Sequence, residues 1–348
     1  MLQLRNTSPF VAEMFGFPDC DGVDTLFVVV KGTFRCTASG VSIAEEQQPV
    51  ILADEYWGEP GESSLRRASE AHPCKLGTDV VVVGEACALG ERPVTAVDVS
   101  VGIANQHKQA RVVGERYWTE GIGGVRPTRP KSFVRLPVTW ERAFGGKHVL
   151  DPNGGTFLAE PRNPVGCGFL GKRAAHELLG QPAPNVEDPR SPIEGPSSRG
   201  KPVGFGPIAP SWAPRVQYAG TYDEAWESTR APYLPRDFDR RFLSTATEEL
   251  WFPRGLAGGE PVAVSGFHPR GRQRFDLPRC ALGLDVTVAG KRQRPQPRLE
   301  TVVLEPTEER FSLSWRASLP VDKKMLKVEQ VDIALERIEG VVPERRSA

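Results

Sequence analysis

LFVVVKGTF, residues 26–34, decides the fold class of this 348-residue chain. β-Branched and aromatic residues fill the stretch, which is typical of a β-strand. From Val94 to Ile103 apolar residues recur at alternate positions, which places one face of a strand in a core. In the first third of the chain, further strands are expected at 41–43, 50–52, 79–83, 94–103, 111–116 and 134–140. Together these stretches predict a sheet of several antiparallel strands.

The last third of the chain returns to the same pattern. Strands are expected at 260–266, 273–277, 284–288, 300–304, 311–315 and 331–335. The 32 Pro and 35 Gly are spread along the chain, which indicates many ordered turns between short elements. The sequence therefore predicts an all-β, sandwich-like fold.

We expect one domain with β-rich parts at 1–144 and 261–338, a loop-rich middle at 145–260 and a short disordered tail at 339–348. The middle is Pro/Gly-rich but carries more aromatic residues than a solvated linker does, so we expect it to be ordered and wrapped on the sheet. Two short helices are expected, at 172–179, which stops at Gly180 and Pro182, and at 222–228.

Composition narrows the function classes. Acidic and basic residues number 44 each, so no overall field attracts nucleic acid or an anionic membrane. No run of about 18 apolar residues and no secretion signal is found, so we expect a soluble, cytoplasmic protein without a membrane partner. The six cysteines lack metal-ligand or redox spacing and are expected to be buried thiols.

Two patterns suggest a cofactor or a metal but lack the necessary context. Gly166, Gly168 and Gly171 match the dinucleotide fingerprint, yet the two prolines in Glu160–Pro164 exclude a buried parallel strand before it. The five histidines lie far apart in the sequence, and none forms the pair that places two ligands on one helical face. We therefore expect neither a cofactor nor a bound metal.

Carboxylates offer the strongest alternative chemistry. Asp237 and Asp239 flank Phe238, and together with Glu141 or Asp223 they could supply the acid and base of a hydrolase acting on carbohydrate or cell wall. The simpler interpretation is that Phe238 packs inward while the two acids pair with neighbouring arginines or cap a turn.

Several short motifs follow one another along nine-tenths of the chain. They are VVVKGTF at 28–34, SSLR at 63–66, GTDV at 77–80, WERAFGG at 140–146, RNPVGCG at 162–168, GFGPI at 204–208, AGTYDEAW at 219–226, LPRDFDRRF at 234–242 and FDLP at 275–278. In this order they resemble DUF2169, a domain-of-unknown-function family whose members are encoded beside type VI secretion genes of Gram-negative bacteria.

The resemblance implies a non-enzymatic adaptor or chaperone that binds an effector and helps to load it onto the valine-glycine repeat spike protein or its PAAR-repeat tip. A β-rich body with exposed edges and loops is compatible with that role. We expect the partner to contact the middle region, at Trp212, Arg215, Tyr222, Trp226, Asp237 and Asp239. A purely structural component of the secretion particle is a third alternative.

Overall fold

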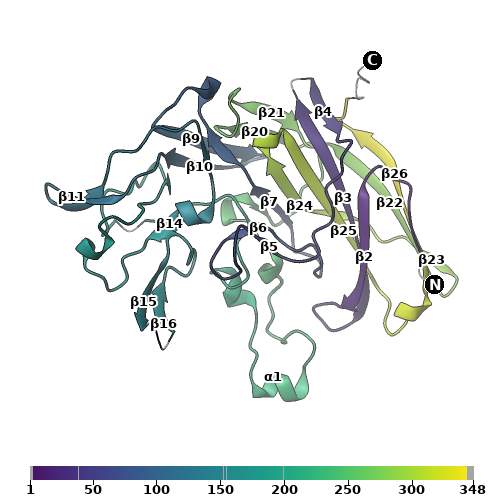
Figure 1. Cartoon of the computed structure of the whole chain (residues 1–348). Coiled ribbons are helices and arrows are strands. Elements are labelled where there is room, and N and C mark those ends of the chain that lie inside the picture. The colour runs from purple at the N-terminus through teal and green to yellow at the C-terminus, as the bar shows by residue number, and fades with distance from the viewer. Residues whose placement is uncertain (1–2, 38, 152, 154, 199, 343–348) are drawn as a thin grey trace.

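The computed structural model describes residues 3–37, 39–151, 153, 155–198 and 200–342 (Figure 1). Strands supply most of its regular structure, and in these ranges the one α-helix is α1 (Glu224–Thr229). The protein is therefore all-β, as the sequence predicts. None of the helices in the described chain is long and apolar enough to cross a membrane.

The largest sheet has seven strands and contains the LFVVVKGTF stretch. Its order is β19-β7-β24-β25-β3-β2, with β4 paired to β3. The strands are β2 (Val11–Pro18), β3 (Asp24–Thr37), β4 (Gly40–Ile43), β7 (Thr78–Val82), β19 (Trp251–Phe252), β24 (Arg298–Glu305) and β25 (Arg310–Pro320). Strand β3 thus pairs over its length with β25, which lies almost 300 residues later in the chain.

The two faces of this sheet differ in chemistry. On β3, Leu26, Val28 and Val30 enter the main hydrophobic core, whereas Lys31 lies one residue out of phase with them. On β25, Phe311, Leu313 and Trp315 enter the core and alternate with Ser312, Ser314 and Arg316. Successive side chains of a strand point to opposite faces. The sheet therefore has an apolar face and a polar face, and both are buried.

Two further sheets share the apolar core. A four-stranded sheet comprises β1 (Gln3–Asn6), β22 (Arg279–Val288), β23 (Lys291–Gln293) and β26 (Val328–Glu339). A five-stranded sheet comprises β9 (Ala96–Ile103), β10 (Gln106–Val113), β18 (Val186–Glu187), β20 (Pro261–Ser265) and β21 (Gln273–Asp276). Leu284 of β22, Val101 of β9 and Val28 of β3 belong to one contiguous cluster. The body is therefore built around a single core.

Short ladders and single 3-10 turns complete the fold. The paired strands are β5 (Glu55–Tyr56) with β6 (Leu65–Arg67), β8 (Glu85–Cys87) with β13 (Arg135–Pro137), β11 (Trp118–Gly121) with β12 (Gly124–Pro127), β14 (Phe144–Gly145) with β17 (Cys167–Gly168), and β15 (Lys147–Asp151) with β16 (Thr156–Ala159). The 3-10 turns are η1 (Leu89–Glu91), η2 (Trp140–Arg142), η3 (Ala175–Leu178), η4 (Arg215–Tyr218), η5 (Arg240–Leu243), η6 (Glu248–Leu250), η7 (Pro306–Glu308) and η8 (Met325–Lys327).

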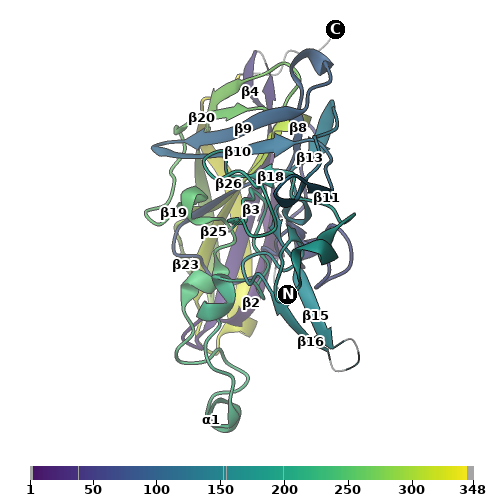
Figure 2. The same ribbon diagram turned by 90° about the vertical axis from the view of Figure 1, so that its left-hand side faces the viewer.

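The middle of the chain covers the sheets and projects from them. Figures 1 and 2 both show α1 at the tip of a long excursion that extends away from the body. We call residues 219–238 the α1 arm. The helix expected at 222–228 is confirmed as α1, one to two residues further along.

Four expectations need correction. Not all strands are antiparallel, because β1 with β26, β7 with β24 and β14 with β17 are parallel pairs. Residues 50–52 form no strand, and 172–179 contains only the turn η3 rather than a helix. The predicted tail starts too early, since Glu339 ends β26 and the Val342 amide donates to the Val41 carbonyl at 2.8 Å. Residues 343–348 lie outside the described residues.

Candidate functional site

Asp237 joins the two ends of the α1 arm, whereas Asp239 fixes a local turn. Asp237 accepts hydrogen bonds from the Thr221 amide at 3.0 Å and the Thr221 hydroxyl at 2.7 Å. Asp239 caps η5 by accepting from the Arg241 amide at 2.9 Å, and it pairs with the Arg241 guanidinium. These contacts lower the pKa of both carboxyls, chiefly through Thr221 for Asp237 and through Arg241 for Asp239. A general acid needs the opposite shift.

Glu141 and Asp223 are held in other places. The Glu141 carboxylate accepts from the Ser64 amide at 2.6 Å and from the Ser64 hydroxyl at 3.0 Å. Asp223 caps α1 by accepting from the Trp226 amide at 2.8 Å. The four carboxylates that a hydrolase could use therefore have separate hydrogen-bond partners, and each supports the local structure.

Trp212 is a core residue rather than a surface contact. Its side chain is 3% exposed and meets the Trp140 ring edge-on, with ring centroids 5.9 Å apart. Leu65 and Ile208 complete this small cluster under the GFGPI motif. From the sequence, Trp212 is expected to contact a partner. An aromatic residue in a loop-rich stretch can be either an interface residue or a core residue, and the sequence does not distinguish the two.

Tyr222 and Trp226 lie together on the α1 arm. Tyr222 is 53% exposed, and its ring meets the Trp226 ring edge-on at 4.7 Å. The Trp226 indole N–H donates to the Tyr233 carbonyl at 2.9 Å, which closes the arm on itself. At its far side the Arg230 guanidinium donates to the Asp21 carbonyl at 3.0 Å in the turn between β2 and β3. The arm is thus a shaped projection with an exposed aromatic surface.

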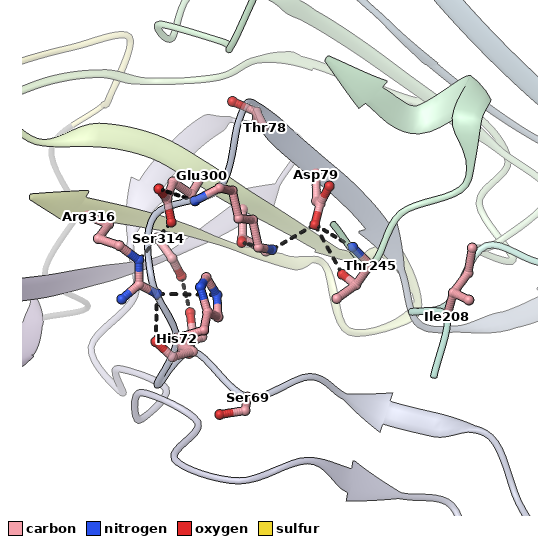
Figure 3. A network of polar contacts seen from close by, with 12 residues as sticks. Ser69, His72, Thr78, Asp79, Ile208, Thr245, Glu300, Ser314 and Arg316 are labelled. Carbon is pink, nitrogen blue, oxygen red and sulfur yellow. Dashed lines mark hydrogen bonds and ion pairs between the residues drawn. The ribbon is translucent and has the colours of Figure 1, made fainter. Parts of the chain in front are cut away.

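A buried ionic network covers the polar face of the large sheet (Figure 3). The Lys31 ammonium pairs with the Glu70 carboxylate at 2.9 Å, and both side chains are less than 10% exposed. The other Glu70 oxygen accepts from the Ser314 hydroxyl of β25, and the Ile51 amide donates to Oε2 at 2.8 Å. Glu70 therefore ties the segment before β7 to both β3 and β25.

Arg316 continues the network along β25. Its Nε donates to the Glu300 carboxylate at 2.7 Å, and its Nη2 donates to the Glu70 carbonyl at 2.6 Å. The same Nη2 lies 3.3 Å from His72 Nε2, while His72 Nδ1 lies 2.5 Å from the Pro73 carbonyl. Nδ1 therefore carries the proton, and Nε2 accepts from Arg316. Burial, followed by the nearby Arg316 charge, holds the pKa of His72 well below its usual value.

The network ends at an ion pair between Lys75 and Asp79. Lys75 Nζ lies 2.7 Å from Asp79 Oδ2 and 3.0 Å from the Thr301 hydroxyl. The Thr245 amide donates to the same Asp79 oxygen at 2.8 Å, which fastens the loop after η5 to β7. The network contains three basic and three acidic side chains, which are Lys31, Lys75, Arg316, Glu70, Asp79 and Glu300. It is balanced in charge and binds the covering loops to the sheet.

Other groups offer little nucleophilic or metal chemistry. Burial raises the pKa of Cys36 and Cys87 to about 11 and of Cys167 and Cys280 to about 12, so these thiols stay protonated near neutral pH. Across the ranges that the structure describes, no group of three or more His, Cys, Asp or Glu side chains is placed to hold a metal ion.

A cleft of about 320 Å³ opens at the base of the α1 arm. We call it the Arg215 cleft. Its walls are Ile208, Pro214, Ala246 and Trp251, and its polar lining consists of Arg215, Tyr218, Arg241, Ser244 and Glu248. Of these residues the sequence predicted only Arg215. The lining residues come from two runs, 208–218 and 241–251, that flank the arm in the sequence. The only sequence signal that could have pointed to the other residues of the cleft was that some lie close to Arg215 in the chain.

Comparison with known proteins places the chain in a family. Residues 21–316, most of the chain, match the family described as "Uncharacterized protein conserved in bacteria (DUF2169)". No curated protein and no solved structure shows significant similarity to the chain. The sequence resemblance to this family is thereby confirmed, and the chain belongs to the DUF2169 family of bacterial proteins.

Proposed function

We propose that this protein is a non-enzymatic, cytoplasmic adaptor that binds a type VI secretion effector and promotes its loading onto the spike or its PAAR tip. The observation that carries the proposal is the α1 arm, a projection from the β-rich body on which the exposed Tyr222 ring packs edge-on against the half-buried Trp226 ring. The chain belongs to DUF2169, and its motifs resemble that family as one found beside type VI secretion genes, which supports the proposal.

Protein partners favour surfaces of this kind. Tyr and Trp are enriched among the few residues that carry most of the binding energy of an interface. Loops positioned by a rigid scaffold carry recognition, because the scaffold reduces the entropy lost on binding. Exposed Val149 and Phe157 on the β15–β16 hairpin, which also projects from the body, enlarge the apolar area available to a partner.

The hydrolase alternative has less support. Asp237, Asp239, Asp223 and Glu141 each hold a turn or a neighbouring segment, and the first two have a lowered pKa. A stable structural component of the secretion particle remains the other alternative, and stoichiometric incorporation into purified particles would distinguish it from an adaptor.

The test is capture from the native cell with a tagged wild type, a Tyr222→Ala variant and a Tyr117→Ala control. Tyr117 is an exposed tyrosine on another part of the surface. We expect the wild type and Tyr117→Ala to capture a toxin-like protein with spike or tip components. Tyr222→Ala should lose at least about five-fold in affinity for the captured effector, which is the effect of truncating a hot spot worth over 1 kcal/mol. Recovery of the wild type alone, without a partner, would contradict the proposal.

A further inference from the structure

Arg215 is a buried cation without an ion pair. Its side chain is at the wall of the Arg215 cleft, and the residue is 8% exposed. Nε donates to the Phe242 carbonyl at 2.9 Å, and Nη1 donates to the Ile208 carbonyl. In the part of the chain that the structure describes, Nη2 donates no hydrogen bond and no carboxylate oxygen forms an ion pair with the guanidinium, which lies over the Phe242 ring at 5.2 Å. Buried charges are normally paired, because removing them from water is costly.

Two more donors at the same cleft lack partners. The Ser244 hydroxyl and the Trp251 indole N–H are both buried, and neither forms a hydrogen bond with any described residue. Buried polar side chains with no partner are rare in native proteins, and an absent ligand is one of the ordinary reasons for them. These two buried groups and Arg215 Nη2, which bonds to no described residue, therefore indicate a ligand that accepts hydrogen bonds.

The charge of the lining defines the ligand further. Arg241 stacks over the Tyr218 ring at 4.2 Å and is neutralised by Asp239, whereas Arg215 has no such partner. Glu248 is the acidic residue of the lining, and it is exposed to solvent. The charge that solvent screens least is thus the positive charge of Arg215. Burial also lowers the pKa of Arg215, and the nearby Asp54 and Asp79 charges offset this lowering only in part.

The position of the cleft points to a protein partner. Tyr218 and Arg241 stack on one another, and the α1 arm leaves the body after the first and returns before the second. A protein partner that extends along the arm from its aromatic surface can also reach the cleft at the base of the arm. The apolar walls suit the methylene groups of a side chain, and the donors suit its carboxylate.

We propose that the Arg215 cleft binds the carboxylate of an Asp or Glu side chain in a segment of the effector. Arg215 Nη2 supplies a charge-assisted hydrogen bond, and Ser244 and Trp251 supply neutral ones. This inference rests on the proposed adaptor function and adds the chemistry of the recognised segment.

The first experiment needs no effector. The ¹⁵N-labelled protein is titrated with N-acetyl-glutamate amide or with its uncharged analogue N-acetyl-glutamine amide, and the Trp251 indole resonance is identified by its loss in Trp251→Phe. We expect a saturable shift with the glutamate probe, at least ten-fold weaker binding of the glutamine probe, and weaker glutamate binding by Ser244→Ala. No shift with either probe, or equal shifts with both, would overturn the assignment.

The second experiment uses the effector captured by the wild type. Ser244→Ala removes a hydroxyl that has no partner, so its denaturation midpoint should stay unchanged or rise. The matched control is Ser197→Ala, which alters an exposed serine elsewhere. We expect Ser244→Ala and Trp251→Phe each to weaken effector binding several-fold and Ser197→Ala to have no effect. Equal binding by all of them would overturn the cleft assignment and leave the adaptor proposal intact. A glutamate-specific shift without any captured effector would contradict both the adaptor and the peptide origin of the ligand.

Discussion

At the scale of single residues, the polar face of the large sheet is covered by buried ion pairs. Lys31 directly follows the apolar run 26–30 of β3, and its charge is matched by Glu70 at 2.9 Å. A buried pair of this kind adds little net stability compared with apolar residues, because desolvation offsets the attraction. The pair is directional, because Glu70 Oε2 accepts from both the Lys31 ammonium and the Ile51 amide and so fixes where the covering segment lies on the sheet.

The first prediction concerns Asp79, which is fully buried. Asp79→Asn removes the charge that neutralises Lys75 and weakens the acceptor for the Thr245 amide. We expect the free energy of unfolding to fall by about 3–5 kcal/mol, because the Lys75 charge is left buried without compensation. The control Asp98→Asn breaks an exposed pair with Arg111 and should cost below about 1 kcal/mol. Urea denaturation measures both, and equal losses would contradict the argument.

The second prediction concerns the pH dependence of stability through His72. The folded protein keeps His72 neutral beside Arg316, whereas the unfolded chain binds a proton there below a pH of about 6.5. Because the unfolded state then binds more protons, stability falls as the pH drops from 7 to 5, by up to about 1.4 kcal/mol per pH unit.

His72→Gln should remove this contribution, and the difference in slope from the wild type is the quantity to measure by denaturation at several pH values. His268, whose pKa is also lowered, adds to the slope of both proteins and cancels in the comparison. The control His176→Gln changes an exposed histidine and should keep the wild-type slope. A slope that is the same in His72→Gln and in the wild type would refute this role of His72.

At the scale of elements, the consecutive motifs WERAFGG and RNPVGCG form one unit. Strand β14 in WERAFGG pairs in parallel with β17 in RNPVGCG. The Asn163 side-chain amide donates to the Trp140 carbonyl at 2.8 Å and to the Phe144 carbonyl at 3.0 Å, which fastens the two motifs together. The glycines of both motifs are needed because the two backbones approach closely.

The third prediction follows from this approach. A Cβ atom on Gly166 would lie 2.4 Å from Asn163 Nδ2 and 2.6 Å from the Ala143 carbonyl oxygen. Gly166→Ala should therefore destabilise the protein by about 1–3 kcal/mol, the usual cost of overpacking. At Gly58 the nearest atom to a new Cβ is 3.5 Å away, so Gly58→Ala serves as the matched control. Thermal unfolding distinguishes them, and equal midpoints would show that the unit relaxes freely.

At the scale of the whole molecule, the first and last parts of the chain complete each other. Strand β25 lies between β24 and β3, and β26 pairs with both β22 and the first strand, β1. The three large sheets contribute to one hydrophobic cluster rather than to separate cores. Neither the amino-terminal third nor the carboxy-terminal third can therefore bury its apolar surface alone.

The fourth prediction is that unfolding is a single cooperative transition. Tryptophan fluorescence, which reports on the clusters around Trp140, Trp212 and Trp315, and far-UV circular dichroism, which reports on the sheets, should give coincident urea curves. Two separated transitions would instead show that the covering loops form an independent folding unit.

The sequence alone determined the fold class and the position of most strands of the three large sheets. In FSLSWRAS at 311–318, Phe311, Leu313 and Trp315 alternate with polar residues, and in LFVVVKGTF the β-branched run selects a strand over a helix. Such signals are local, because a strand reveals its buried face through its own period of two. The sequence also determined the family, through short motifs that recur in a fixed order.

Only the tertiary structure decided which charges meet and where the candidate site lies. Ser314 and Arg316 bond to Glu70 across more than 240 residues, and no local pattern records such a pairing. The same holds for the Arg215 cleft, whose two lining runs meet because the α1 arm leaves and returns at one point. The physical reason is that strand formation depends on neighbours in the chain, whereas ion pairs and clefts depend on neighbours in space, which sheet pairing and loop packing bring together.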